Sequence, residues 1–263
     1  MPVEIPIYQV NAFTDQPFAG NPAAVCPLYQ WLPDEVLQQI AAENNLSETA
    51  FYVPEAHEYA LRWFTPRVEV PLCGHATLAA GWVVFHREPE RDQILFATQS
   101  GQIAVERSDD LYAINLPASR PDPCEHPEDL LACLGENTSL VTVVSDHRRF
   151  VVELENEAAV REFEPNLGLL EQLPKEGVSV TAPGDEVDFV SRYFAPAVGV
   201  PEDPVTGAAH CTLVPYWSRK LEKTTLHARQ LSQRGGDVYC EHMDDRVMLT
   251  GNVVPYLEGV IRV

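Results

Sequence analysis

One stretch of the sequence occurs twice, about half a chain length apart. Residues 62–71 read Arg-Trp-Phe-Thr-Pro-Arg-Val-Glu-Val-Pro, and residues 192–201 read Arg-Tyr-Phe-Ala-Pro-Ala-Val-Gly-Val-Pro. A second match follows in the same order, because residues 101–110 and 236–245 share a glycine, a glutamate and a pair of aspartates at corresponding places. Two ordered matches indicate that the chain consists of two copies of one structural unit.

Each half shows the same expected order of elements. Strands come first, then an amphipathic helix, a strand carrying the Arg-aromatic-Phe motif, an apolar helix and a β-hairpin. In the first half we expect a strand at 5–13, a helix from Pro33, a strand at 50–53, a helix at 75–85 and a hairpin at 101–116. In the second half we expect strands at 140–146 and 150–154, helices at 165–173 and 208–219 and a hairpin at 236–250.

The helix after Gly74 is apolar on every side, so it must be surrounded by other elements. We therefore expect an α+β fold with two pseudo-equivalent domains, each a β-barrel-like sheet wrapped around a central helix. The expected domains are 1–118 and 119–252, with the last strand, about 253–263, as a candidate addition to the first. The proline-rich stretch 117–127 is the expected linker.

The net charge and the cysteines limit the classes of partner and the compartment that we expect for this chain. The net charge of −21 argues against nucleic acid or an anionic membrane, which both need clustered Lys and Arg. The six cysteines form no Cys-x-x-Cys pair, and no secretory signal is visible, so we expect a soluble cytoplasmic protein with reduced thiols. Cys73, His75, His210 and Cys211 lack zinc-site spacing, so no metal is expected, and no nucleotide or flavin motif is found.

The glycines that open the two apolar helices are candidate binding residues. Gly74 and Gly207 correspond in the repeat, and a helix start presents unpaired N–H groups and the positive end of the helix dipole. Two such sites would hold an anionic small molecule without Lys or Arg. Cys73 precedes one glycine, but Thr206 precedes the other, which disfavours a symmetric two-thiol racemase.

Three further residues are candidate acid–base groups. Glu48 breaks the repeat, His75 follows Gly74 at a helix start, and Asp203 precedes a proline. Each also has a purely structural interpretation: a surface-loop glutamate, a buried structural histidine and a turn residue. For Glu48 the residues alone favour the loop, and for His75 and Asp203 they leave both interpretations open.

Five segments together resemble the phenazine-biosynthesis PhzF-like family, which has the diaminopimelate epimerase-like fold. They occur in the family's order and span nearly the whole chain. These segments are Asn11-Ala-Phe-Thr-Asp-Gln-Pro-Phe-Ala-Gly-Asn-Pro22, Asn45-Leu-Ser-Glu-Thr-Ala-Phe51, Arg62-Trp-Phe-Thr-Pro66, Val70-Pro-Leu-Cys-Gly-His-Ala-Thr-Leu-Ala79 and Glu202-Asp-Pro-Val-Thr-Gly-Ala-Ala-His210.

The resemblance implies a homodimer without cofactor, an active site in the cleft between two domains, and an isomerase. A glutamate matching Glu48 moves a proton between carbons of a dihydro-hydroxyanthranilate in the phenazine enzyme. Residues matching His75 and Asp203 hold the substrate and assist, which makes Glu48 the first choice as acid–base residue. Cys73, Gly74, Thr206, Gly207 and Ala208 are the expected substrate-binding residues.

The chain departs from the family pattern at one place. The family commonly reads Asp-Pro-Val-Thr-Gly-Ser-Ala, with a serine that contacts the substrate, whereas this chain has Ala208 there. The missing hydroxyl places the phenazine substrate in doubt. Two alternatives to a Glu48-dependent isomerase stay open, and the second of them is motivated by Ala208. One is an epimerase that uses Cys73 with a non-thiol partner, and the other is a metabolite-binding protein without turnover.

Overall fold

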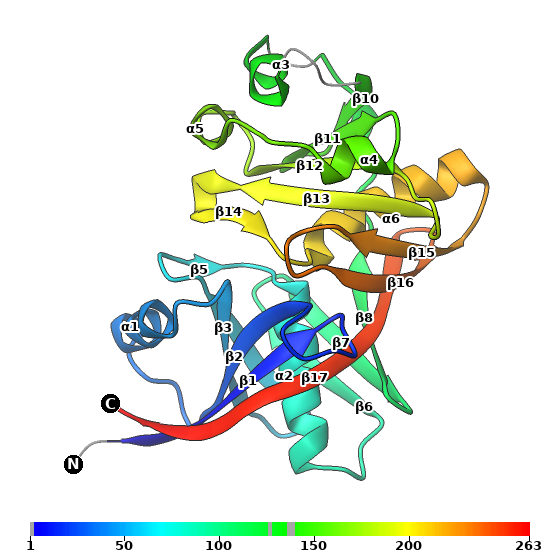
Figure 1. Ribbon diagram of the computed structural model, residues 1–263. Coiled ribbons are helices and arrows are strands. Elements are labelled where there is room, and N and C mark those ends of the chain that lie inside the picture. The colour runs from blue at the N-terminus through cyan, green and yellow to red at the C-terminus, as the bar shows by residue number, and fades with distance from the viewer. Residues whose placement is uncertain (1–2, 126–127, 136–139) are drawn as a thin grey trace. The chain divides into compact units, whose positions relative to one another are not determined.

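The computed structural model describes residues 3–125, 128–135 and 140–263. The chain forms two compact units, Met1–Leu116 with Leu249–Val263, and Pro117–Met248. Each unit is α+β and contains a curved sheet and one long buried helix (Figure 1). The described residues include no helix that is long and apolar enough to cross a membrane.

The strands of the first unit close into a barrel. Pairing runs from β17 through β1, β2, β3, β4, β6 and β7 to β8, which pairs again with β17. The pairs β2–β3 and β4–β6 are parallel, and the pairs β17–β1, β1–β2, β3–β4, β6–β7 and β7–β8 are antiparallel. The strands are β1 (Glu4–Ala12), β2 (Asn21–Pro27), β3 (Glu48–Pro54), β4 (Tyr59–Phe64), β5 (Glu69–Val70), β6 (Gln93–Thr98), β7 (Gly101–Ser108), β8 (Leu111–Pro117) and β17 (Arg246–Arg262).

The helix α2 (Gly74–Arg87) fills the barrel, as its all-round apolar sequence predicts. It contacts β1, β2, β3 and β7. A Cβ atom on Gly81 would lie 2.7 Å from the Val105 Cγ1 atom, so glycine is needed where this helix passes β7. The second helix, α1 (Asp34–Asn44), buries Leu37 and Ile40 against the opposite face of the sheet, where they pack in one core with Ile5 and Ile7.

The second unit repeats this plan. Its strands pair in the order β9, β10, β11, β12, β13, β15 and β16, and the parallel pairs β11–β12 and β13–β15 correspond to the two parallel pairs of the first unit. Helix α6 (Gly207–Leu221) corresponds to α2 and is buried from Ala209 to Ser218. The strands are β9 (Asp122–Pro123), β10 (Leu140–Ser145), β11 (Arg149–Leu154), β12 (Gly177–Pro183), β13 (Phe189–Ala195), β14 (Val200–Asp203), β15 (Thr225–Gln230) and β16 (Gly236–Met243).

The repeated arginine has the same structural role in both units. Arg62 on β4 lies 2.7 Å from Glu69 through its Nη2 atom, and its guanidinium lies over the Phe64 ring. Arg192 on β13 lies 2.7 Å from Glu202 through its Nε atom and covers the Phe194 ring in the same way. The sequence repeat therefore marks an internal ion pair that joins β4 to β5 and β13 to β14.

The structure adjusts two expectations about the second half. The helix predicted at 165–173 is present in shorter form as α5 (Leu167–Leu170), and a second short helix, α4 (Glu157–Arg161), precedes it; the side chains of Asn166 and Asn156 cap these two helices. The stretch 117–127 is not a bare linker. Its residues 122–123 form β9, which pairs with β10, and a further helix, α3 (Glu128–Leu134), follows; residues 126–127 lie outside the described residues.

Candidate functional site

The start of α2 carries the candidate residues of the first unit. Cys73 is the N-cap residue and Gly74 the first helical residue, with the Thr77 N–H donating the first helical bond to the Cys73 carbonyl at 3.2 Å. The N–H groups before Thr77 lie within the first turn and have no carbonyl of the helix to pair with. The structure thus places Cys73, Gly74 and His75 at a helix start, as predicted.

His75 is the second residue of α2 and is only 2% exposed. Burial lowers the pKa of its imidazole to about 3, because the apolar surroundings disfavour the charged form. His75 is therefore a neutral imidazole at physiological pH, and one of its ring nitrogens carries the proton while the other accepts a hydrogen bond.

Asn21 determines which nitrogen of His75 carries the proton. This fully buried residue begins β2, and its Nδ2 atom lies 3.0 Å from the His75 Nδ1 atom. An amide nitrogen only donates, so Nδ1 accepts and the imidazole proton resides on Nε2. Gly20 precedes Asn21 with a φ of +66°, and a Cβ atom there would lie 2.3 Å from the Ala12 carbonyl oxygen, so only glycine fits this turn.

Glu48 lies on the Nε2 side of His75. Its Oε2 atom is 3.2 Å from His75 Nε2, and its side chain is 14% exposed. The interpretation of Glu48 as a surface-loop residue is therefore wrong: it is the first residue of β3. Because β3 runs parallel to β2 with Glu48 opposite Ala23, the two strands present Glu48 and Asn21 at neighbouring places to the same histidine.

Cys73 approaches the other side of the imidazole. Its Sγ atom lies 3.5 Å from His75 Nδ1, and the ligand atoms of Glu48, Cys73 and His75 lie within 4.8 Å of one another. Thiolate, imidazole and carboxylate are ligands that zinc accepts. However, Cys73 faces Nδ1 whereas Glu48 faces Nε2, and an ion bound to one nitrogen lies away from the other partner. The geometry favours a chain of polar contacts through the imidazole over a shared metal ion.

The start of α6 carries the candidate residues of the second unit. Asp203 ends β14 and is 7% exposed, and its Oδ2 atom accepts a hydrogen bond of 2.6 Å from the Thr206 hydroxyl. Gln230 connects the same group, since its side chain donates to the Asp203 carbonyl at 2.7 Å and accepts from the Thr206 N–H at 2.9 Å. Asp203, Thr206 and Gln230 thus form one buried hydrogen-bonded group, and Gly207 follows Thr206 as the first residue of α6.

Ala208 follows Gly207 on the first turn of α6 and is half-buried. Its carbonyl accepts a hydrogen bond from the Arg149 guanidinium, which also donates to the Thr212 hydroxyl at 3.3 Å. Arg149 also lies 3.8 Å from Asp146 in a buried ion pair, and its hydrogen bonds to Ala208 and Thr212 tie β11 to α6. The histidine of this helix, His210, is fully buried one turn in and contacts the Thr206 carbonyl through Nδ1, so it belongs to the core of the second unit.

Two residues of these groups were missed by sequence reasoning. Asn21 lies within the Gly-Asn-Pro end of the first family segment, and an amide beside a turn glycine was the signal that could have marked it. Gln230 has no such signal, because it comes from the end of β15, far along the sequence from Asp203.

The fold of each unit defines the class of protein. A protein of Pseudomonas aeruginosa described as a predicted epimerase matches with a TM-score of 0.73 and 18% identity, covering 98% of this chain and 99% of that one. At this identity the likeness concerns the fold, which is the epimerase-like arrangement of sheets around central helices.

The chain belongs to the phenazine biosynthesis-like PhzC-PhzF family, whose model matches residues 10–259. An uncharacterised isomerase of Pseudomonas aeruginosa is 49% identical over 98% of this chain and 99% of its own. The crystal structure of a PhzF family protein of Enterococcus faecalis matches with a TM-score of 0.94 and 42% identity, covering 99% of this chain and 100% of that one. The chain is accordingly an isomerase of this family.

Proposed function

We propose that this isomerase moves a proton between two carbons of a small carboxylate-bearing metabolite, without a cofactor, and that Glu48 is the acid–base group. The observation that carries the proposal is the 3.2 Å contact between Glu48 Oε2 and Nε2 of the neutral His75. A carboxylate in such surroundings can accept a proton from carbon, return it elsewhere and keep a fixed orientation throughout.

The step uses a single base. The Glu48 carboxylate removes a proton from a carbon next to an electron-withdrawing group, and the electron pair of the broken C–H bond moves into the adjoining π system. The resulting carboxylic acid then returns the proton to another carbon of the same system, which regenerates Glu48. A second base is not required. Thr206, which corresponds to Cys73 in the sequence repeat, donates its hydroxyl to Asp203, and a hydroxyl is not a base for a C–H proton at neutral pH.

The N-termini of α2 and α6 are the groups that we expect to bind the negative charge of the substrate. We assign the unpaired N–H groups at Gly74 and Gly207 to the substrate carboxylate, because a helix N-terminus stabilises an anion. Asp203 is assigned to a donor group of the substrate, such as an amine or hydroxyl. Cys73, Thr206 and Ala208 complete the binding residues, and His75 holds Glu48 and the substrate in place through Nε2.

A second candidate rests on the position of Cys73. Its Sγ atom lies 3.5 Å from His75 Nδ1, so the thiol is beside the imidazole that also contacts Glu48. If the protein is an epimerase that uses Cys73 and a non-thiol partner, a thiol reagent should inactivate the wild type, and bound substrate should prevent this. The reagent should cause no further loss in Cys73→Ala. Full activity of Cys73→Ala would rule this mechanism out.

The proposed role of Glu48 is tested by screening for turnover and then substituting the base. Small carboxylates with an acidic C–H, including the dihydro-hydroxyanthranilate that the resemblance suggests, are incubated with the protein and followed by NMR. Glu48→Gln should lower kcat by about 10²–10⁴-fold on any accepted substrate. Glu43→Gln, on an exposed residue of α1, is the matched control and should turn over like wild type. Wild-type kcat in Glu48→Gln would remove Glu48 from the chemistry, and a ligand bound but recovered unchanged would favour a binding protein.

A further inference from the structure

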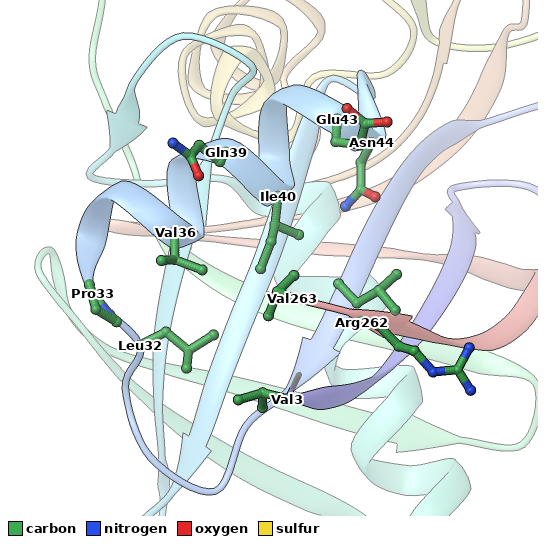
Figure 2. A pocket seen from close by; sticks show the side chains of 11 residues that line it. Val3, Leu32, Pro33, Val36, Gln39, Ile40, Glu43, Asn44, Arg262 and Val263 are labelled. Atoms are coloured by element: carbon green, nitrogen blue, oxygen red, sulfur yellow. The ribbon is translucent and has the colours of Figure 1, made fainter. Parts of the chain in front are cut away.

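The apolar groove of the first unit does not supply positive charge for a carboxylate. This groove has a volume of about 790 Å³ and lies between α1 and the end of β17, where Val36 and Ile40 point toward it (Figure 2). The charged side chains described at its wall are Glu43 and Arg262, which have opposite signs, and Arg262 pairs with Glu4 at 2.9 Å. The second unit, in contrast, holds a buried cation at the start of α6.

Gly177 of the second unit corresponds to Glu48 of the first. The repeated motif fixes this alignment, because Trp63 and Tyr193 occupy the same place in it. The residue opposite Trp63 on β3 lies two places after Glu48, and the residue opposite Tyr193 on β12 lies two places after Gly177. A Cβ atom on Gly177 would lie 2.5 Å from the Tyr193 hydroxyl oxygen, so the phenol occupies the space where an acid–base side chain would begin.

Arg149 corresponds to Ala23 of the first unit by the same registers. Ala23 pairs with Glu48 between the parallel strands β2 and β3, and Arg149 pairs with the counterpart of Glu48 between β11 and β12. Ala208 corresponds to His75, because each is the second residue of its central helix. The first unit thus has a carboxylate beside the second residue of α2, whereas the second unit has a guanidinium bonded to the second residue of α6.

Arg149 is buried beside the first turn of α6. It is only 4% exposed, and its Nη1 atom donates to the Ala208 carbonyl and, at 3.3 Å, to the Thr212 hydroxyl. Its guanidinium carbon lies 5.9 Å from the centre of the Tyr193 ring, and Tyr193 pairs with Asp203 in the ladder between β13 and β14. The cation therefore contacts both the helix start and the aromatic residue that lies opposite Asp203.

The counter-ion of Arg149 is bonded one turn farther along the helix. The Asp146 Oδ2 atom is 3.8 Å from Arg149 Nη1, too long for a hydrogen bond, and accepts the Thr212 hydroxyl at 2.6 Å. The Oδ1 atom accepts the backbone N–H groups of Arg148 and Arg149, each at 2.7 Å. Thr212 comes one turn after Ala208, so it is the guanidinium and not the carboxylate that adjoins the first turn of α6.

We propose that Arg149 is a positioning residue of this isomerase, which fixes the first turn of α6 and adds positive charge to the N–H groups assigned to the substrate carboxylate. The inference rests on the proposed function, in which Gly207 binds that carboxylate. A positive charge near a helix N-terminus adds to the field of the helix dipole, and burial protects it from screening. Because Arg149 is buried, it acts through the helix rather than by contact with the substrate.

NMR titration of the ¹⁵N-labelled protein with anthranilate and anthranilamide tests this role, because only anthranilate carries a carboxylate. The amide signals of Gly207 and Ala208 report binding at α6. Arg149→Gln should raise the dissociation constant for anthranilate about tenfold and that for anthranilamide less than about twofold. Arg149→Lys keeps the charge and should bind anthranilate within about threefold of wild type. Arg148→Gln is the matched control with wild-type affinity, since Arg148 pairs with Glu176 at 2.8 Å.

The counter-ion allows a test in the opposite direction. Asp146→Asn removes the negative charge but keeps an acceptor for the backbone N–H groups, so it should lower the dissociation constant for anthranilate about threefold. If the ion pair were merely structural, Asp146→Asn and Arg149→Gln would change binding in the same direction, because both break it. Arg149→Gln in the Asp146→Asn background leaves neither charge buried alone, so it covers a single variant that folds poorly. It should again raise the dissociation constant about tenfold.

Three results would overturn the role of Arg149. These are a wild type that binds both probes equally or neither, an equal loss for both probes in Arg149→Gln, and weaker anthranilate binding in Asp146→Asn. The titrations need no turnover, which separates this inference from the proposed function. Turnover that depends on Glu48, with anthranilate binding unchanged in Arg149→Gln, would reject this inference alone. Arg149-dependent binding of anthranilate by a protein that turns over no carboxylate would reject the proposed function alone.

Discussion

The Asn21 Nδ2 atom lies 3.0 Å from the Nδ1 atom of His75 and thereby determines the tautomer of the buried imidazole. With Nδ1 accepting, the ring carries its proton on Nε2, and this atom lies 3.2 Å from Glu48 Oε2 without forming a hydrogen bond to it. Asn21 is thus a positioning residue for the pair that we assign to proton transfer. Its effect should be measurable without knowledge of the substrate.

Replacing Asn21 by aspartate should reverse the polarity of the histidine. A carboxylate accepts at Nδ1, so the His75 proton moves to Nδ1 or the ring becomes charged, and its pKa rises from the value of about 3. The expected readout is a change in the ¹⁵N shifts of His75, with a kcat lowered about 10-fold or more.

Asn21→Ala separates positioning from packing. This variant removes the donor without offering an acceptor, so we expect a smaller change in the ¹⁵N shifts of His75 than in Asn21→Asp. The loss of stability should be similar in the two variants. If Asn21→Asp left the tautomer and the pH profile of activity unchanged, Asn21 would have only a structural role.

The two buried histidines should make folding sensitive to acid. Burial lowers the pKa of His75 to about 3 and that of His210 to about 4. Below pH 6.5 the unfolded chain binds protons on both rings that the folded chain does not, so the free energy of unfolding falls as the pH falls toward these values. Between pH 6.5 and 5 each histidine should lower the free energy of unfolding by about 1.6 kcal/mol.

Urea unfolding at several pH values measures this effect. In His75→Gln only His210 remains of the two buried histidines. Below pH 6.5, their contribution to the slope of the unfolding free energy against pH should therefore fall to about half. An exposed histidine, His57, offers the control, and His57→Gln should keep the wild-type slope. An unchanged slope in His75→Gln would mean that the folded protein protonates His75 readily.

Restoring the family serine should alter substrate preference. Ala208 is half-buried on the first turn of α6, so Ala208→Ser adds a hydroxyl next to the helix start that we assign to the substrate. A further hydrogen bond to substrate should lower KM for the dihydro-hydroxyanthranilate by about 3- to 10-fold. Steady-state kinetics of both proteins check this, and an equal KM would place Ala208 outside the binding residues.

The central helix should not tolerate a methyl group at Gly81. The Cβ atom of Gly81→Ala would lie 2.7 Å from Val105 Cγ1, and Val105 is fully buried on β7. Overpacking should therefore outweigh the better helix propensity of alanine and lower the free energy of unfolding by about 1–3 kcal/mol. In the Gly81→Ala background, Val105→Ala should cost less than in wild type. Additive effects of the two substitutions would show that the contact relaxes freely.

Much of the fold followed from periodicity and repetition. The match between residues 62–71 and 192–201 identified β4 and β13, and the apolar stretch after Gly74 predicted a helix that had to be enclosed. The short helix α4 was not predicted, and α5 is shorter than the helix predicted at 165–173, because both depend on caps at Asn156 and Asn166 rather than on a long apolar face. The extension of β17 to Arg262 depends on pairing with β1, at the other end of the sequence.

The candidate site was less accessible to sequence reasoning. Residues adjacent in sequence, such as Cys73, Gly74 and His75, were found from their position at a helix start. Glu48 was chosen only through the family resemblance, because nothing local shows that parallel pairing of β2 and β3 brings it to His75. Gln230 was missed for the same reason, since its contact with Asp203 is set by tertiary structure.

Proton transfer in D₂O tests the central claim most directly. The wild-type protein should place deuterium from solvent at one carbon of the isomerised product, and mass spectrometry and NMR locate the label. Glu48→Gln should lose turnover and deuterium incorporation together, by about 10²–10⁴-fold, whereas Glu43→Gln should retain both. Undiminished incorporation of deuterium by Glu48→Gln would contradict the account, because another group would then be the base.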